Sequence, residues 1–217
     1  MLTLFDELFL LSIHEAKGVQ IKTTTERLKL GLAGALLAEL ALLEKIKNTD
    51  NHRLQVVDQA HTSDDDLLNE TIDLLAAEEK GHKFGYWLNQ LSQKADKTRK
   101  QIIKNLIQKN VFTQDDDRLV WVIPFPLKTT AKASAKSQMI KRLRGIVLAQ
   151  DEFQKRDIAL LSLLRACGLL DRAFLDDERK MASRAINEML FSQAISDSVI
   201  QTVQEIETAL SGLVEED

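Results

Sequence analysis

Apolar residues recur at helical spacing along most of the chain. At the start, Leu2, Phe5, Leu8 and Phe9 follow the period of one helix face. The same periodicity predicts outer amphipathic helices over residues 67–77, 86–91, 98–108, 139–148, 178–191 and 196–213. Residues 28–43 and 158–170 are apolar on nearly all sides, which is typical of helices that lie inside a bundle. We therefore expect two central helices packed near each other and covered by the others.

Residues 118–128 interrupt this pattern, because they are rich in β-branched and aromatic side chains. They predict a strand or hairpin. Pro124 and Pro126 argue against a central strand and leave an edge strand or a protruding loop, in which Trp121 and Phe125 are exposed. The polar stretch 129–137 is too short to mark a domain boundary, so residues 1–217 are expected to form a single domain.

Composition supports a mostly α fold with a short protruding β-hairpin. The 217 residues are 44% hydrophobic but include only 8 Gly and 2 Pro, too few turn residues for a sandwich or barrel. The single cysteine, Cys167, cannot form an internal disulfide and lies in an apolar run, so we interpret it as a core residue in a reducing compartment. No apolar run is long enough to cross a membrane, and the first residues lack a signal peptide, so we expect a cytoplasmic protein.

The formal net charge of −4 conceals a strong segregation of charge. Residues 58–79 contain eight acids and no Lys or Arg, whereas residues 94–109 contain six basic residues and one acid. Residues 128–144 contain six basic residues and no acid. Such segregation predicts a surface that attracts anionic lipid or nucleic acid, with ordinary solvated helix faces as the alternative.

Several stretches, in order, resemble the Golgi phosphoprotein 3 family over nearly the whole chain. They are LTLFDELFLL at 2–11, GLAGALLAELAL at 31–42, TSDDDLLNE at 62–70, WL at 87–88, KNLIQKNV at 104–111 and RDIALLSLL at 156–164. The resemblance implies a central four-helix bundle, a hairpin that serves self-association, a basic pocket for phosphatidylinositol 4-phosphate, and no catalysis. In this chain the hairpin residues for self-association or membrane insertion would be Trp121, Val122, Ile123 and Phe125.

The lipid pocket that the resemblance implies is only partly retained. Its Trp position falls at Thr24, its first Arg at Ala33, and its two later Arg positions at Asp96 and Arg99. Because Arg99 alone keeps the guanidinium that can bind phosphate through two hydrogen bonds, we expect general attraction to anionic lipid more than recognition of one headgroup. The residues expected to supply it are Lys94, Lys97, Arg99 and Lys100, with Lys22, Arg27 and Lys29 as helpers.

Candidate catalytic and metal-binding patterns are weak. Glu79 and His82 have the Glu-x-x-His spacing of di-iron bundles, but that chemistry needs a second copy. His61 precedes three aspartates without the remainder of a calcium loop. Cys167 has no surrounding nucleophile motif, and Gly31 and Gly34 lack the rest of a phosphate-binding loop. We expect no enzyme activity, metal or cofactor, and we assign the two glycines to close helix packing.

Glu39 is a carboxylate among apolar neighbours, so its burial requires a partner. We predict a structural ion pair or hydrogen bond, with Arg142, Arg144 or Arg165 as candidates. The overall hypothesis is a non-enzymatic adaptor-like domain that binds anionic membrane lipid and self-associates. The alternative is a protein or nucleic-acid scaffold that uses the same basic face, although no nucleic-acid-binding motif is present and no nucleic-acid partner is expected.

Overall fold

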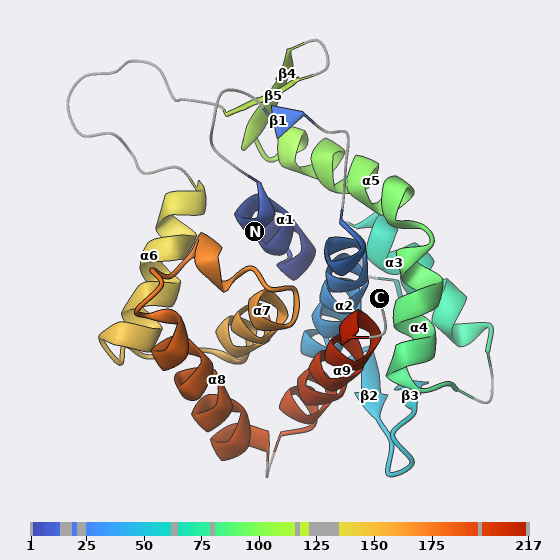
Figure 1. Ribbon diagram of the computed structural model, residues 1–217. Coiled ribbons are helices and arrows are strands. Elements are labelled where there is room, and N and C mark those ends of the chain that lie inside the picture. The colour runs from blue at the N-terminus through green and yellow to red at the C-terminus, as the bar shows by residue number, and fades with distance from the viewer. Residues whose placement is uncertain are drawn as a thin grey trace.

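The computed structural model describes residues 2–13, 19–20, 25–61, 65–78, 81–115, 118–121, 135–194 and 197–215 (Figure 1). Within these residues the fold is mostly helical, as the sequence predicts. The helices are α1 (Leu4–Ser12), α2 (Glu26–Leu42), α3 (Asp66–Ala76), α4 (Phe84–Ser92), α5 (Ala95–Gln108), α6 (Ala135–Leu148), α7 (Lys155–Ala166), α8 (Arg179–Ala194) and α9 (Ser198–Glu215). The short strands are β1 (Val19–Gln20), β2 (Ile46–Asn48), β3 (Leu54–Val56), β4 (Phe112–Asp115) and β5 (Arg118–Trp121).

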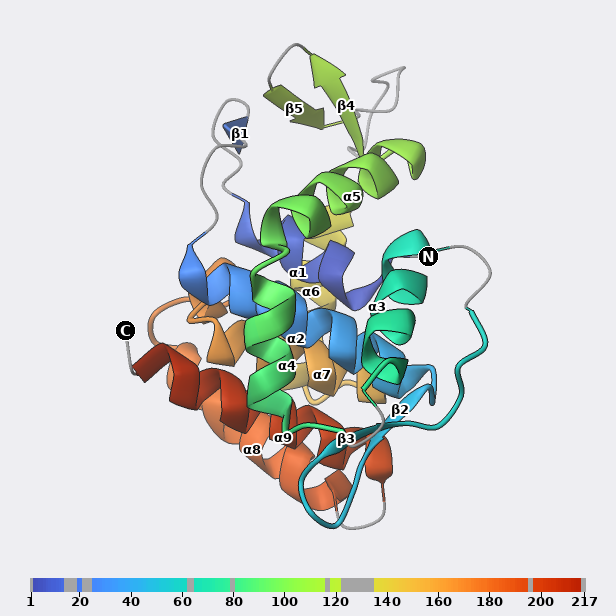
Figure 2. The ribbon, with the colours of Figure 1, turned by 90° about the vertical axis from the view of Figure 1, so that its right-hand side faces the viewer.

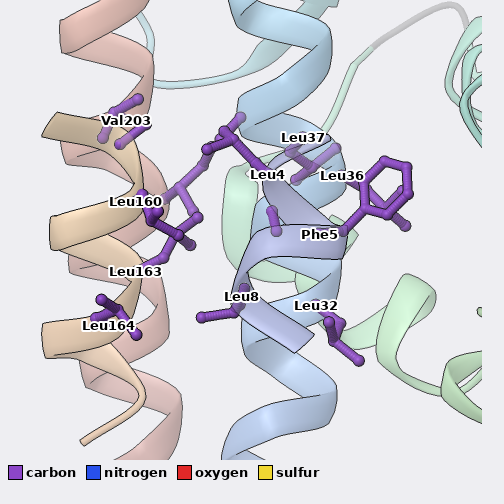
Figure 3. Close-up of a cluster of buried hydrophobic side chains, with 14 of the residues drawn as sticks. Leu4, Phe5, Leu8, Leu32, Leu36, Leu37, Leu160, Leu163, Leu164 and Val203 are labelled. Carbon is purple, nitrogen blue, oxygen red and sulfur yellow. The ribbon is translucent and has the colours of Figure 1, made fainter. Parts of the chain in front are cut away.

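Four helices form the centre of the molecule. Helix α2 contacts α1, α7 and α9, and α7 in turn contacts α1 and α9. Figure 3 shows leucines of α1, α2 and α7 meeting one another beside Val203 of α9. The remaining helices surround this bundle, with α3, α4 and α5 on one side and α6 and α8 on the other (Figure 1). The four-helix centre agrees with what the family resemblance implies.

Helix α9 corrects the expectation that residues 196–213 form an outer helix. Its apolar face is buried against α2 and α7, and Ile200, Val203, Ile206 and Leu210 are almost inaccessible. An amphipathic pattern shows that one face is buried, but it does not show whether the helix joins the central bundle or covers it. The prediction of two central helices was therefore incomplete.

Two glycines of α2 allow the central helices to approach closely. A Cβ atom at Gly31 would lie 2.1 Å from Cys167 Sγ, at the end of α7. At Gly34 it would lie 3.0 Å from side-chain atoms of both Ile206 and Leu210 on α9. The assignment of these glycines to helix packing is confirmed. Cys167 is buried, as predicted, and burial raises the pKa of its thiol to about 12, so the thiol stays protonated and unreactive.

A strand lies within residues 118–128, as predicted, but its place in the sheet differs from the prediction. Strand β5 lies between β1 and β4 in an antiparallel sheet, with Phe112 opposite Trp121 and Asp115 opposite Arg118. Because it pairs on both sides, β5 is a central strand and not the expected edge strand. Pro124 and Pro126 do not prevent this pairing, since β5 ends before them, at Trp121. Val122, Ile123 and Phe125 lie outside the described residues. The second pair, β2 and β3, was not predicted.

None of the helices, over the residues described, is long and apolar enough to span a bilayer.

Candidate anion-binding surface

Helix α5 presents a stripe of lysines on its outer face. Lys97, Lys100 and Lys104 are spaced at i, i+3 and i+7, which places them within an arc of roughly 60° on a helix. All three are exposed, whereas Thr98, Ile102, Leu106 and other residues on the opposite face are buried. Lys100 and Lys104 form no ion pair with any described residue. We call these three residues the α5 lysine stripe.

The buried side of α5 is fixed to the bundle by polar contacts. Lys109 Nζ lies 2.6 Å from a carboxylate oxygen of Asp6, which is fully buried on α1. Asn105 donates a 3.2 Å hydrogen bond to Asp65, the residue that caps α3. These contacts hold the inner face of α5 toward α1 and α3, and the lysines of the stripe are exposed on the opposite face. Figure 2 shows α5 on the outside of the bundle.

The positions carried over from the family lipid pocket do not form an open arginine site. The Arg99 side chain is only 14% exposed, and its guanidinium lies 3.4 Å from Asp96 Oδ1. Ala33 is 2% exposed within α2, so it cannot contact a lipid surface. Thr24 lies outside the described residues. Among the residues named from the sequence, the exposed Lys94, Lys97 and Lys100 are better placed than Arg99 to meet a phosphate.

Part of the segregated charge is neutralised within the fold. Lys97 Nζ on α5 lies 2.5 Å from Glu70 Oε2 on α3, which connects the acidic and basic segments, although both side chains remain more than half exposed. In the second basic segment, Arg142 pairs with Glu7 and Asp157, and Arg144 donates two hydrogen bonds to Glu178. Lys136 is buried and donates to a main-chain carbonyl, that of Ile13. The arginines and Lys136 of the second segment therefore have structural roles.

Glu39 has the structural partner that the sequence demanded, but not one of the expected arginines. Arg156 on α7 donates hydrogen bonds of 3.0 and 2.9 Å to its two oxygens, and the Leu4 amide donates one of 2.6 Å. Arg142, Arg144 and Arg165 pair with other carboxylates. Glu39 thus connects α2 to α1 and α7.

Glu7, next to this pair on α1, is also buried. Burial raises the pKa of its carboxyl group, against the lowering effect of Arg142 and Arg156. The guanidinium of Arg156 lies 3.6 Å from Glu7 and also donates to the Leu2 carbonyl. The α1–α6–α7 junction therefore contains an ionic cluster whose carboxylates are buried and whose Arg142 reaches the surface.

The histidines that the structure describes form contacts with single carboxylates. His61 lies 2.8 Å from Asp73, and His82 lies 3.6 Å from Glu78 and stacks on Tyr86. Glu79 lies outside the described residues. In the described part of the chain, no three His, Cys, Asp or Glu side chains are grouped so that they could hold a metal ion.

The sequence predicted that residues 94–109 are basic, but not which of their side chains share the exposed face of α5. Lys104 was not singled out, although its spacing from Lys97 and Lys100 on a helix could have placed it on the same face. The partial burial of Arg99 was not predictable in this way, because it depends on how α5 sits on the bundle.

The described residues thus form a helical bundle that carries the basic helix α5 on its outside (Figure 2). The family model for Golgi phosphoprotein 3 (GPP34) matches residues 4–206, and the chain therefore belongs to this family. A comparison with curated proteins gives no match.

Proposed function

We propose that this protein is a non-catalytic, adaptor-like domain that binds the surface of anionic membranes through the α5 lysine stripe. The observation that carries the proposal is that Lys97, Lys100 and Lys104 share the exposed face of a helix whose other face is fixed to the core. Lys94 is also exposed, immediately before the helix. Membership of the Golgi phosphoprotein 3 family supports the proposal.

The physical basis is long-range attraction rather than a specific pocket. A lysine near an anionic membrane surface contributes about 1 kcal/mol, and the three stripe lysines together contribute roughly 3 kcal/mol, on the order of a hundredfold in partitioning. Lys97 contributes less while Glu70 neutralises it. Because Arg99 is largely covered and lies beside Asp96, recognition of phosphatidylinositol 4-phosphate would rest on added negative charge more than on a two-bond arginine contact.

The test is co-sedimentation with vesicles that contain increasing fractions of phosphatidylserine or phosphatidylinositol 4-phosphate. Binding should rise with the anionic fraction and fall with salt. Replacing Lys97, Lys100 and Lys104 together by Gln should weaken it at least tenfold. Vesicle binding that does not change with the anionic lipid fraction would contradict the proposal.

A matched control separates the stripe from total charge. Lys47, Lys141 and Lys180 are exposed on β2, α6 and α8, and replacing all three by Gln removes the same charge elsewhere. This variant should retain most of the binding. If both triple variants lose binding equally, net charge and not the stripe would be responsible. A gel shift at moderate salt tests the alternative that the same lysines bind nucleic acid.

Self-association through Trp121, Val122, Ile123 and Phe125, of which only Trp121 at the end of β5 lies in the described part of the chain, remains a prediction. Its structural support is limited to the backbone, because β4 is an edge strand of the sheet in the part of the chain described here.

A further inference from the structure

A cleft at the β2–β3 end of the molecule gathers basic and aromatic side chains from distant parts of the chain. It has a volume of about 710 Å³ and lies between the turn after β2, the start of α4 and the outer face of α9. Its lining residues include His52, Arg53, His82, Lys83, Tyr86 and Glu205. None of them belongs to the α5 lysine stripe.

Two cations are held side by side at this cleft by the backbone. Arg53 and Lys83 face each other in an antiparallel β-bridge, and the next residue, Leu54, donates its amide to the His82 carbonyl at 2.9 Å. Directly opposed residues of an antiparallel pair point to the same face with Cβ atoms about 5 Å apart, and like charges in this position repel. Both side chains are exposed and both line the cleft.

No acid in the described part of the chain forms an ion pair with either cation. Arg53 donates one hydrogen bond, of 2.9 Å, to the Gly81 carbonyl, which leaves most of its donors available. Glu205, which also lines the cleft, lies 2.6 Å from His52, and Glu78 lies 3.6 Å from His82. Arg53 and Lys83 are therefore two cations without an ion-pair partner among the described residues, at opposed positions of one β-bridge, while Glu205 of the cleft lies against His52.

We propose that this cleft binds a phosphate group. A phosphate carries up to two negative charges near neutral pH, which matches the two cations, and its oxygens accept the fork of N–H donors that a guanidinium offers. His52 and His82 flank the two cations and add donors when protonated. The same chemistry fits inorganic phosphate, a soluble phosphate ester and a phosphorylated lipid headgroup.

The proposal does not depend on the membrane function proposed for α5. The cleft is lined by residues of the turn between β2 and β3. Figure 2 shows these two strands at the end of the molecule away from α5. Loss of vesicle binding in the stripe variant and loss of phosphate binding in cleft variants are consequently separate outcomes.

The test is an NMR titration of the isotope-labelled protein with inorganic phosphate at constant ionic strength. Resonances of His52, His82 and the Gly85 amide should shift and saturate. Arg53→Gln and Lys83→Gln should each weaken binding by about tenfold or more, because each removes a charge-assisted hydrogen bond. Lys47→Gln, which removes an exposed charge from the same hairpin outside the cleft, should bind as the unmodified protein does.

A second arm identifies the source of the phosphate. The same titration is made with a soluble short-chain phosphatidylinositol 4-phosphate. Saturation by inorganic phosphate assigns the site to soluble phosphate ligands, whereas saturation by the lipid alone assigns it to a lipid headgroup. In either case Arg53→Gln and Lys83→Gln must weaken the binding. The proposal is overturned if neither probe saturates, or if both variants bind as tightly as the unmodified protein.

Discussion

Glu39 and Arg156 connect three helices at the centre of the molecule. Glu39 is 5% exposed on α2, Arg156 lies on α7, and the main chain at Leu2 and Leu4 completes the contacts at the start of α1. The pair is separated by 117 residues in sequence, so a local pattern could indicate that Glu39 needs a partner but not which arginine supplies it. Asp6 and Glu7 were missed for a related reason, since a charged residue in an amphipathic sequence is usually exposed.

Replacing Glu39 by Gln should destabilise the protein by about 3 kcal/mol, because it removes the charge that accepts two hydrogen bonds from the partly buried Arg156 and leaves only Glu7, 3.6 Å away, as a carboxylate beside that guanidinium. The measurement is urea-induced unfolding followed by circular dichroism. Glu26→Gln is the control, since Glu26 pairs with Lys29 on the exposed first turn of α2 and should matter little. Equal losses in the free energy of unfolding for the two substitutions would contradict the prediction, because the Glu39–Arg156 pair would then contribute no more to stability than the exposed Glu26–Lys29 pair.

At the scale of elements, most helices could be predicted because their apolar periods are long and seldom interrupted. The strands were predicted less completely than the helices. β2 and β3 have three residues each, too few for a periodic signal, and they are fixed by contacts such as the hydrogen bond from the Asn48 amide to Thr202 on α9. The position of Arg53 beside Lys83 depends on the same non-local arrangement, so the phosphate cleft had no local sequence signal.

The approach of α2 to α7 gives a prediction at this scale. Gly31→Ala should destabilise the protein by about 1–3 kcal/mol, because the new methyl group would lie 2.1 Å from Cys167 Sγ. The high helix propensity of Ala offsets part of this cost. The free energy of unfolding in urea measures the result.

A second substitution should rescue the first. Cys167→Ala removes the sulfur and leaves only the Cβ of residue 167, which would lie 3.7 Å from the new methyl group, an ordinary contact. The double variant should therefore be more stable than the sum of the two single effects. Gly212→Ala serves as the control, because nothing lies within 4 Å of a Cβ at that position of α9. Strict additivity of Gly31→Ala and Cys167→Ala would contradict the steric explanation.

At the scale of the whole molecule, the two proposed anion sites lie at different ends. Helix α5, which carries the lysine stripe, lies at one end with β4 and β5, and β2 and β3 lie at the other (Figures 1 and 2). The Arg53–Lys83 cleft is lined by the turn between β2 and β3. A protein that meets a membrane through the stripe would therefore leave the cleft open to solution. This arrangement would allow one molecule to contact a membrane and a phosphate-bearing ligand together.

The orientation on a membrane can be tested with an environment-sensitive fluorophore attached to a single introduced cysteine. Cys167 need not be removed, because it is buried and its thiol, with a pKa of about 12, is not ionised at neutral pH. Gln108 on α5 and Gln55 on β3 are both exposed and uncharged, so Gln108→Cys and Gln55→Cys form a matched pair. On anionic vesicles, the probe at position 108 should shift to the blue while the probe at position 55 should not, since only the first lies at the end that carries the stripe. A shift at position 55 alone would reverse the proposed orientation and place the cleft, rather than α5, against the lipid.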